Sequence, residues 1–297
     1  MNADVEERAR RDRIVSIFHT ALARHGIQLE IGRMDFHLGD KAIIELTSRP
    51  AGLSEVVLDN MFPQEPAPTT LYHYTGLDGF QGIISSGELR LHPIRKRLGQ
   101  GGELAAFAKA HALGGYLDSS NGEEFYKGLS DDLYYVSLTR VPPKDPQVMW
   151  GAFAKGTGVR LELKVAPKPT AALRPIYYEQ HGSTTLLQEI NDRLKAAGEP
   201  PFNPWTISRI GAFYLDDTVA SEDEVRLLIK RYRYYSDWDG CGLNDESPDY
   251  WPIPIDWAND FCDLQLTGIH VAPGGSVDAI SAVLAGTRFA RVPVAGP

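Results

Sequence analysis

The chain has little of what marks disulfide-bonded, metal-rich or membrane-spanning proteins. Its 297 residues include two cysteines, Cys241 and Cys262, which is too few for a disulfide framework or a Cys-rich metal site. No apolar run approaches the ~20 residues that cross a bilayer. Residues 1–13 are dense in charge and lack the apolar core of a secretory signal. We therefore expect a cytoplasmic protein without a bound metal or a membrane partner.

Several motifs of nucleotide-binding and hydrolytic enzymes are also missing. No Gly-x-Gly-x-x-Gly turn opens a helix after a strand, no Gly-x-Ser-x-Gly elbow is present, and no pair of histidines has ligand spacing. The net charge of −9 argues against a general nucleic-acid surface, which needs clustered Lys and Arg. Two local basic stretches remain, in residues 8–13 and 92–97. Each is either a solvated face or part of a local basic path.

The composition that is present, 43% hydrophobic and 23% charged, is typical of a globular protein. Apolar residues at helical spacing predict an amphipathic helix over residues 4–25, and alternation predicts strands over 27–31 and 42–46. Three prolines between residues 62 and 70 indicate a boundary. We therefore expect an N-terminal helix–strand extension over 1–62 and a Pro-rich linker over 63–70.

Residues 71–297 have a different pattern, which predicts one α+β domain. Strands are expected at 71–75, 133–139, 159–165, 225–234 and 266–271, and helices at 78–84, 146–154, 184–196 and 276–284. Asp78 is expected to cap the first of these helices, and Gly87 to end it in a left-handed conformation. Short strands mixed with helices, without strict βαβ alternation, are typical of an α+β fold.

His73 is the first residue that could carry chemistry. It stands inside the strand-like Leu71-Tyr-His-Tyr-Thr75. One interpretation is a core histidine that bonds a backbone carbonyl. The other is a neutral imidazole at a strand end, placed to bond a ribose hydroxyl.

The second candidate is the strand over residues 133–139. With a period of two, Tyr135, Ser137 and Thr139 share one face, and the opposite face is apolar. The polar face is either an ordinary half-wet surface or a set of hydroxyls that can hold a partner carboxylate, with an aromatic ring for stacking.

The third candidate is the acidic pair Glu222 and Glu224. If both belong to the strand, their side chains share a face and repel each other, and Arg226 continues that face and can compensate the charge. The pair is either an exposed strand start or a carboxylate placed beside a developing cation. Cleavage of a nicotinamide–ribose bond passes through an oxocarbenium-like state, which carboxylates stabilise in glycosidases.

The order of these motifs resembles the bacterial uncharacterised domains of the ADP-ribosyltransferase superfamily. The resemblance covers residues 70–295, about three-quarters of the chain. It is carried by the Tyr-His-Tyr-Thr opening with Ser86-Gly-Glu-Leu-Arg90, by Ser137-Leu-Thr139 with Met149-Trp150 and Gly158-Val-Arg-Leu-Glu162, by Ser221-Glu-Asp-Glu-Val-Arg226, and by Leu266-Thr-Gly-Ile-His-Val-Ala-Pro-Gly274.

The resemblance implies two small bent sheets that form a cleft for NAD, with flanking helices, and it implies a role for each motif. His73 would bond the adenosine-side ribose, and Tyr74 or Tyr135 would stack on the nicotinamide. Ser137 would hold Glu224, which would bond the nicotinamide ribose and stabilise the cation. Glu222 would orient or deprotonate the acceptor. Thr75 and Thr139 complete the expected NAD-binding set. Arginine-modifying members open with Arg where this chain has His73.

The function that the resemblance implies is NAD-dependent mono-ADP-ribosyl transfer to a macromolecular acceptor, in a bacterial toxin or anti-phage effector. NAD would be a co-substrate and no metal would be needed. The acceptor (protein, DNA or RNA) stays open, as does an antitoxin or inhibitory partner and delivery into a target-cell cytoplasm. Two alternatives share the fold. One is a non-catalytic module that binds NAD, another nucleotide or a partner. The other is an RNA 2′-phosphotransferase, with Arg90, His92 and Arg95 as the phosphate cradle.

Overall fold

A computed structural model describes most of the chain, which forms two compact units. The described residues are 3–46, 52–97, 102–120, 123–124, 127, 130, 133–140, 146–179, 184–204, 209, 211–215, 217–230 and 249–297. Unit 1 comprises Met1–Pro63, Arg97–Leu129 and Glu179–Leu215, and unit 2 comprises Gln64–Lys96, Ser130–Tyr178 and Asp216–Pro297. Both units combine helices with strands, which confirms the α+β class. No described helix is long and apolar enough to cross a membrane.

Unit 1 is built around the predicted N-terminal helix. Its elements are α1 (Ala3–Arg24), β1 (Phe36–Leu38), β2 (Ile43–Glu45), α2 (Leu53–Met61), α4 (Glu103–Ala110), η2 (Gly114–Tyr116), β5 (Ser119–Ser120), β6 (Glu123–Glu124), α7 (Leu186–Ala196), β11 (Phe202–Asn203) and β12 (Tyr214–Leu215). Phe18 of α1 packs on Phe36 and on Phe202, with ring centroids 4.9 and 5.5 Å away. Burial of these aromatic rings holds α1, β1 and β11 together across 180 residues of sequence.

The basic stretch at residues 8–13 lies on the solvent side of α1. Arg10 and Arg13 both bind the carboxylate of Glu199, at 2.8 and 2.7 Å, and Arg11 pairs with Glu7. These three guanidinium groups are already engaged by two acids of the same unit. Their arrangement favours the interpretation as a solvated helix face over that of a basic path.

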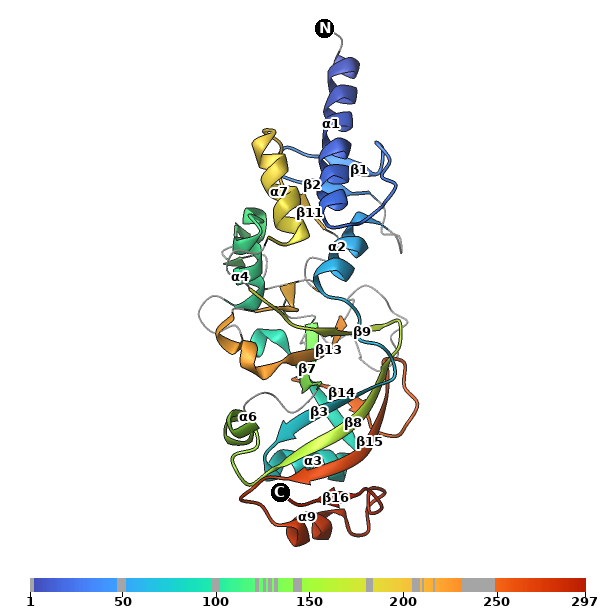
Figure 1. Cartoon of the computed structure of the whole chain (residues 1–297), viewed down its shortest axis with the longest axis vertical. Helices are drawn as coiled ribbons and strands as arrows, with labels where there is room; N and C mark the ends of the chain where they lie inside the picture. Colours follow the sequence, from blue (N-terminus) through green and yellow to red (C-terminus); the bar gives the residue numbers. More distant parts are fainter. Residues whose placement is uncertain are drawn as a thin grey trace. The chain divides into compact units, whose positions relative to one another are not determined.

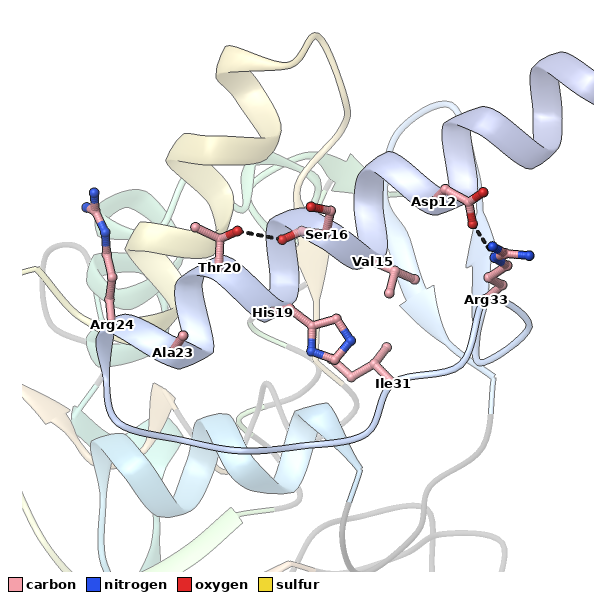
Figure 2. A pocket seen from close by; sticks show the side chains of 9 residues that line it. All are labelled: Asp12, Val15, Ser16, His19, Thr20, Ala23, Arg24, Ile31 and Arg33. Atoms are coloured by element: carbon pink, nitrogen blue, oxygen red, sulfur yellow. Dashed lines mark hydrogen bonds and ion pairs between the residues drawn. The ribbon is translucent and has the colours of Figure 1, made fainter.

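An open hollow runs beside α1 and is lined by that helix and by Ile31 and Arg33 (Figure 2). Asp12 pairs with Arg33 at one end, and the Thr20 hydroxyl donates to the carbonyl of Ser16 within the helix. The one carboxylate in the lining is therefore already paired.

His111 ties α4 to α7 inside unit 1. Its Nδ1–H donates to the carbonyl of Phe107 at 2.9 Å, and its Nε2 accepts from the hydroxyl of Thr185 at 2.9 Å. Thr185 is also the N-cap of α7, in a capping box with Gln188. Burial lowers the pKa of His111 to about 4, against the opposing effect of the Phe107 carbonyl. The native unit therefore contains this imidazole in its neutral form.

We expect the stability of unit 1 to fall in mild acid. Because the folded pKa of His111 lies below its unfolded value near 6.5, its contribution is complete above pH 6.5 and is lost as the pH falls toward 4. The loss should reach about 3 kcal/mol, and urea unfolding across this pH range measures it. His111→Gln, which does not titrate, should flatten the curve. An equal slope in the variant would show that other groups cause the acid sensitivity.

Unit 2 is a mixed sheet with two of its helices on its apolar face. Its elements are β3 (Thr69–Thr75), α3 (Leu77–Ser86), β4 (Glu88–Pro93), η1 (Ile94–Arg97), β7 (Leu133–Thr139), α6 (Pro146–Ala152), β8 (Val159–Pro167), β9 (Ala171–Pro175), β10 (Tyr177–Tyr178), η3 (Asp217–Glu222), β13 (Glu224–Lys230), β14 (Trp251–Pro254), β15 (Cys262–Val271), α9 (Val277–Leu284) and β16 (Val294–Ala295). The strand order is β14-β4-β7-β3-β8-β15-β16, and β13 pairs with both β7 and β9.

The sheet splits between β3 and β7. These strands share one register position, Tyr72 opposite Thr139, and β4 pairs with the other end of β7, His92 opposite Tyr135. On the far side of the split, β3, β8 and β15 run side by side in long antiparallel ladders (Figure 1). The divergence opens one edge of β7 between its two neighbours.

The apolar face of the sheet follows from alternation in the sequence. Val159, Leu161, Leu163 and Val165 of β8 are fully buried, and the apolar positions of β7, β13 and β15 join them in one core with α3 and α9. The intervening residues, including Arg160 and Glu162, project from the opposite face. One side of the sheet is therefore core, and the other carries polar and aromatic side chains.

Some predicted elements differ from the structure. Residues 27–31 are irregular, because they pair with no strand. The N-cap of α3 is Gly76, one residue before the helix, so Asp78 lies in the first turn and does not cap it, whereas Gly87 has the predicted left-handed conformation. Cys241 and residues 231–234, the predicted end of the strand at 225–234, lie outside the described residues. Cys262 is a buried free thiol, and burial raises its pKa to about 12.

The compact units do not follow the predicted domain bounds of 1–62, 63–70 and 71–297. Residues 97–129 and 179–215 belong to the same unit as residues 1–63. Local composition could not reveal this, because the packing of α1 against α7 depends on contacts between distant segments.

Candidate functional site

A buried carboxylate, Glu224, occupies the start of β13. The hydroxyl of Ser137, on the neighbouring strand β7, donates to Glu224 Oε1. The guanidinium of Arg226 binds the same carboxylate through both oxygens, Nε to Oε1 at 2.9 Å and Nη2 to Oε2 at 3.2 Å. Antiparallel pairing sets Arg226 opposite Ser137, so all three side chains share one face. The predicted compensation of Glu224 by Arg226 is present.

An aromatic ring and a phenol complete the surroundings of this pair. The Arg226 guanidinium lies 4.4 Å from the centre of the Tyr135 ring, a cation–π contact. The hydroxyl of Tyr178 accepts a hydrogen bond from the Glu224 backbone amide at 2.9 Å. Burial raises the pKa of Tyr178, which is also close to the acidic charges of Glu224 and Glu222. The Glu224 carboxylate is therefore held by a hydroxyl and a cation, and its backbone by a neutral phenol.

His73 lies at the split in the sheet. Its Nδ1 donates to the backbone carbonyl of Ser137 at 3.0 Å, in the place where a continuing β3–β7 ladder would satisfy that oxygen. Burial lowers the pKa of His73, the Ser137 carbonyl opposes this, and nearby His92 lowers the pKa further. The imidazole is therefore neutral, with a lone pair on Nε2 that can accept a hydrogen bond. The bond to a backbone carbonyl is the one that the core-histidine interpretation predicts, and the ring retains a second polar atom.

Glu222 does not share the strand of Glu224. It ends the 3-10 helix η3, and Asp223 between the two acids has a left-handed backbone with φ of 45°. The alternation that would place both acids on one face begins only at Glu224. Glu222 is half-buried and Glu224 is 2% exposed. The expectation of a paired acidic face is therefore wrong in its geometry, because a positive φ turns the chain before the strand.

Thr139 and Tyr74 lie on the same face of the sheet as Glu224. Thr139 stands between Glu224 and Tyr72 in register, and its hydroxyl is buried without a hydrogen-bond partner among the described residues. Tyr74 packs edge-on against Trp150 of α6, with ring centroids 4.9 Å apart, and its hydroxyl also lacks a described partner. Of the two rings predicted to stack on nicotinamide, Tyr135 is the one that contacts Arg226, the partner of Glu224.

Thr75, at the end of β3, has its side chain on the opposite face of the strand from Tyr74. Its hydroxyl has one weak contact, to the Gly76 carbonyl at 3.5 Å. The structure therefore brings Tyr135, Ser137, Thr139 and Glu224 to one face, with Glu222 and Tyr74 at its margins. His73 lies with Thr75 on the other face of β3 and reaches the site through the Ser137 carbonyl, whereas Thr75 is apart from it.

Sequence reasoning missed a second polar group on the same face, at Arg160. The guanidinium of Arg160 lies 4.8 Å from the centre of the Tyr72 ring and 6.0 Å from those of Tyr74 and Trp150. The neighbouring acid, Glu162, instead accepts from the Thr267 hydroxyl at 2.9 Å and lies 3.5 Å from Nε2 of His270. Alternation along β8 placed Arg160 on a polar face, but only the tertiary structure shows the aromatic rings around it.

The proposed phosphate cradle is less well supported. Arg90 and His92 lie on the exposed face of β4, and the Arg90 guanidinium is stacked 4.3 Å from the Tyr250 ring. Arg95 follows in the 3-10 helix η1 and is half-buried. Arg90 and His92 alternate along β4 and Arg95 lies beyond its end in η1, which gives the RNA 2′-phosphotransferase alternative no particular support.

No group of three or more His, Cys, Asp or Glu in the described part of the chain could hold a metal ion. Comparison with protein-family models, curated proteins and solved structures gave no match to this chain. The motif resemblance to ADP-ribosyltransferase domains therefore rests on the sequence motifs alone, and the geometry described above has to carry any functional argument.

Proposed function

We propose that this chain is an NAD-dependent mono-ADP-ribosyltransferase whose site is the face of unit 2 around Glu224. The observation that supports it most is the hydrogen bond from Ser137 to Glu224, with the neutral imidazole of His73 attached to the same residue of β7. The contact between Ser137 and Glu224 is the one that the motif resemblance implies. The split between β3 and β7, within one connected sheet, is a second feature that supports an NAD site here.

In the proposed reaction the bond between nicotinamide nitrogen and ribose C1′ breaks, and its electron pair leaves with nicotinamide. The Glu224 carboxylate stabilises the positive charge that develops on the ribose. Ser137 fixes the carboxylate, and Tyr135 offers a ring to the nicotinamide. A nucleophile of the acceptor then attacks C1′ and loses its proton, for which Glu222 is the proposed acceptor.

One observation favours a second candidate, a nucleotide-binding module without catalysis. Glu224 is 2% exposed and is bound through both oxygens by Arg226, which is fully buried. A carboxylate already neutralised in this way stabilises a developing cation less than a free one. This module would bind NAD or a related nucleotide without consuming it.

Two measurements on the wild-type protein separate the candidates. Calorimetry with NAD reports binding, and chromatography of the same mixture reports free nicotinamide. Binding with continuous nicotinamide release supports the transferase, and binding without release supports the module. Absence of both contradicts the proposed NAD site.

The acceptor can be identified with labelled NAD. Incubating the protein with cell extract and labelled NAD, followed by mass spectrometry, tests protein, DNA and RNA acceptors together. A bacterial toxin or anti-phage effector with an antitoxin or inhibitory partner fits such an activity, because uncontrolled transfer damages the cell that makes it. Label found in no macromolecule, with nicotinamide released, would instead assign NAD hydrolysis.

His73→Ala should weaken NAD binding more than it slows the chemical step. A ribose contact to Nε2 is made in both ground and transition states, so its loss raises KM with little change in kcat. The expected loss is about 1–2 kcal/mol, or roughly 5- to 30-fold in KM. Steady-state kinetics on the folded variant measure it.

The same substitution also leaves the Ser137 carbonyl without its bond, so the melting temperature should fall in parallel. Thermal unfolding of His73→Ala is therefore the control measurement. A destabilised variant that binds NAD as well as the wild type does would limit His73 to closing the split in the sheet.

A further inference from the structure

The Arg160 cluster on β8 has the composition of a site for an anion. We define it as Arg160 with Tyr72, Tyr74 and Trp150, whose rings surround the guanidinium at 4.8, 6.0 and 6.0 Å. Aromatic rings restrict the motion of an arginine without neutralising its charge. The planar guanidinium matches phosphate geometry and can donate two parallel hydrogen bonds.

Arg160 has no acidic partner within the part of the chain that the structure describes. Its Nε is buried and makes no hydrogen bond there. The acid two residues along the strand, Glu162, is engaged by Thr267 and by His270. Arg226, which lies on the same face, is by contrast bound through two nitrogens to Glu224. Arg226 thus has an anionic partner within the described chain, and Arg160 does not.

Two buried hydroxyls on this face also lack a described partner. They belong to Tyr74 and Thr139, which are 5% and 3% exposed. Polar groups buried this deeply are nearly always hydrogen-bonded, and leaving one unpaired is costly. Packing of Arg160 against the rings explains its position but not these three unpaired groups on one surface. A polar ligand that enters between them would satisfy all three.

The register of the strands relates this cluster to Glu224. Glu224, Thr139, Tyr72 and Glu162 stand opposite one another on β13, β7, β3 and β8, and Arg160 pairs with Tyr74 in the next row. Arg160 is therefore two strands from Ser137, on the order of 10 Å at ordinary strand spacing and farther where the sheet splits. In NAD the diphosphate is joined to carbon 5′ of the nicotinamide ribose. A ribose at Glu224 would extend its diphosphate along this face.

We propose that Arg160 and the Tyr74 hydroxyl bind the diphosphate of a nucleotide, on the polar face of β3 and β8. The inference rests on the proposed function for the identity of the nucleotide, but the site itself requires only a phosphate-bearing ligand. The guanidinium donates to two phosphate oxygens, the Tyr74 hydroxyl donates to a third, and Tyr72 and Trp150 flank the group. Glu162 lies nearby but is already held by Thr267 and His270.

Calorimetry with ADP and with inorganic diphosphate tests the site without requiring turnover. We expect both to bind the wild type and Arg160→Gln to weaken ADP binding by roughly 10- to 100-fold, the range for a lost charge-assisted bond. Tyr74→Phe, which removes only the unpaired hydroxyl, should weaken it roughly threefold or more without lowering the melting temperature. Lys164→Gln is the matched control, since Lys164 is an exposed cation on the same face of β8. It should leave binding nearly unchanged.

Three results would overturn the inference. One is the absence of ADP and diphosphate binding to the wild type. The second is wild-type affinity in a folded Arg160→Gln variant, and the third is an equal loss of affinity in Lys164→Gln, which would indicate an unspecific charge effect. The outcome is independent of catalysis: ADP binding that needs Arg160 in a protein that never releases nicotinamide supports the site and contradicts the transferase. Nicotinamide release in a protein whose ADP binding does not depend on Arg160 supports the transferase and contradicts the Arg160 site.

Discussion

Glu224→Gln is expected to reduce nicotinamide release by about 100-fold or more, the largest catalytic effect that the proposed function predicts. Glutamine keeps the shape of the side chain and can still accept from Ser137, but it removes the negative charge that faces the ribose cation. Initial rates of nicotinamide release at saturating NAD measure the loss. NAD binding should change much less, because the charge matters most in the transition state.

The matched control is Glu65→Gln. Glu65 is also a buried carboxylate of unit 2 that pairs with an arginine, Arg140, with Nε 2.7 Å from Oε1. Both substitutions disturb a Glu–Arg pair, so any effect of losing such a pair on stability should appear in both. The free energy of unfolding in urea measures that effect. Unchanged nicotinamide release in folded Glu224→Gln would remove this residue from catalysis. Equal losses in both variants would assign the effect to the fold.

Arg226→Met should destabilise the protein by about 3–5 kcal/mol, the cost of leaving one member of a buried ion pair without its partner. The Arg226 side chain is fully buried and that of Glu224 is 2% exposed. Methionine fills a similar volume but supplies neither the two bonds to the carboxylate nor the cation–π contact with Tyr135. The free energy of unfolding in urea measures the change.

A double variant identifies the cause. Arg226→Met combined with Glu224→Gln no longer contains a buried charge, so it should recover much of the lost stability. Arg140→Met is the comparison, because the Arg140 side chain is 45% exposed and water can replace it at Glu65. Its cost should be less than half that of Arg226→Met. If Arg226→Met and Arg140→Met lower the free energy of unfolding equally, or if the double variant recovers no stability, burial of the two charges does not explain the contribution of the Arg226–Glu224 pair.

The same pair decides between the two candidate functions. If Arg226 only neutralises the charge of Glu224, the native protein binds the nucleotide without turnover. Only removal of Arg226 would then leave a free carboxylate. If the pair is part of a transferase, Arg226 positions the acid for the ribose. Nicotinamide release by the wild type, measured beside the stability of Arg226→Met, distinguishes these roles.

The sequence by itself determined which residues share a face along each strand. The alternation of Val159, Leu161 and Leu163 placed one side of β8 in the core, and the same rule put Ser137 and Tyr135 on the opposite side of β7. It also placed Arg226 on the face of Glu224, where the ion pair is found. These features follow from the local geometry of an extended chain, in which side chains alternate whatever the strand packs against.

Only the tertiary structure decided the rest, because it depends on segments that meet from distant parts of the chain. The divergence of β3 from β7 brings His73 to the Ser137 carbonyl, and no pattern within either strand encodes that separation. The left-handed Asp223 removes Glu222 from the face of Glu224. The rings around Arg160 come from β3 and α6, so an arginine that alternation marks as merely polar gains an aromatic setting through packing.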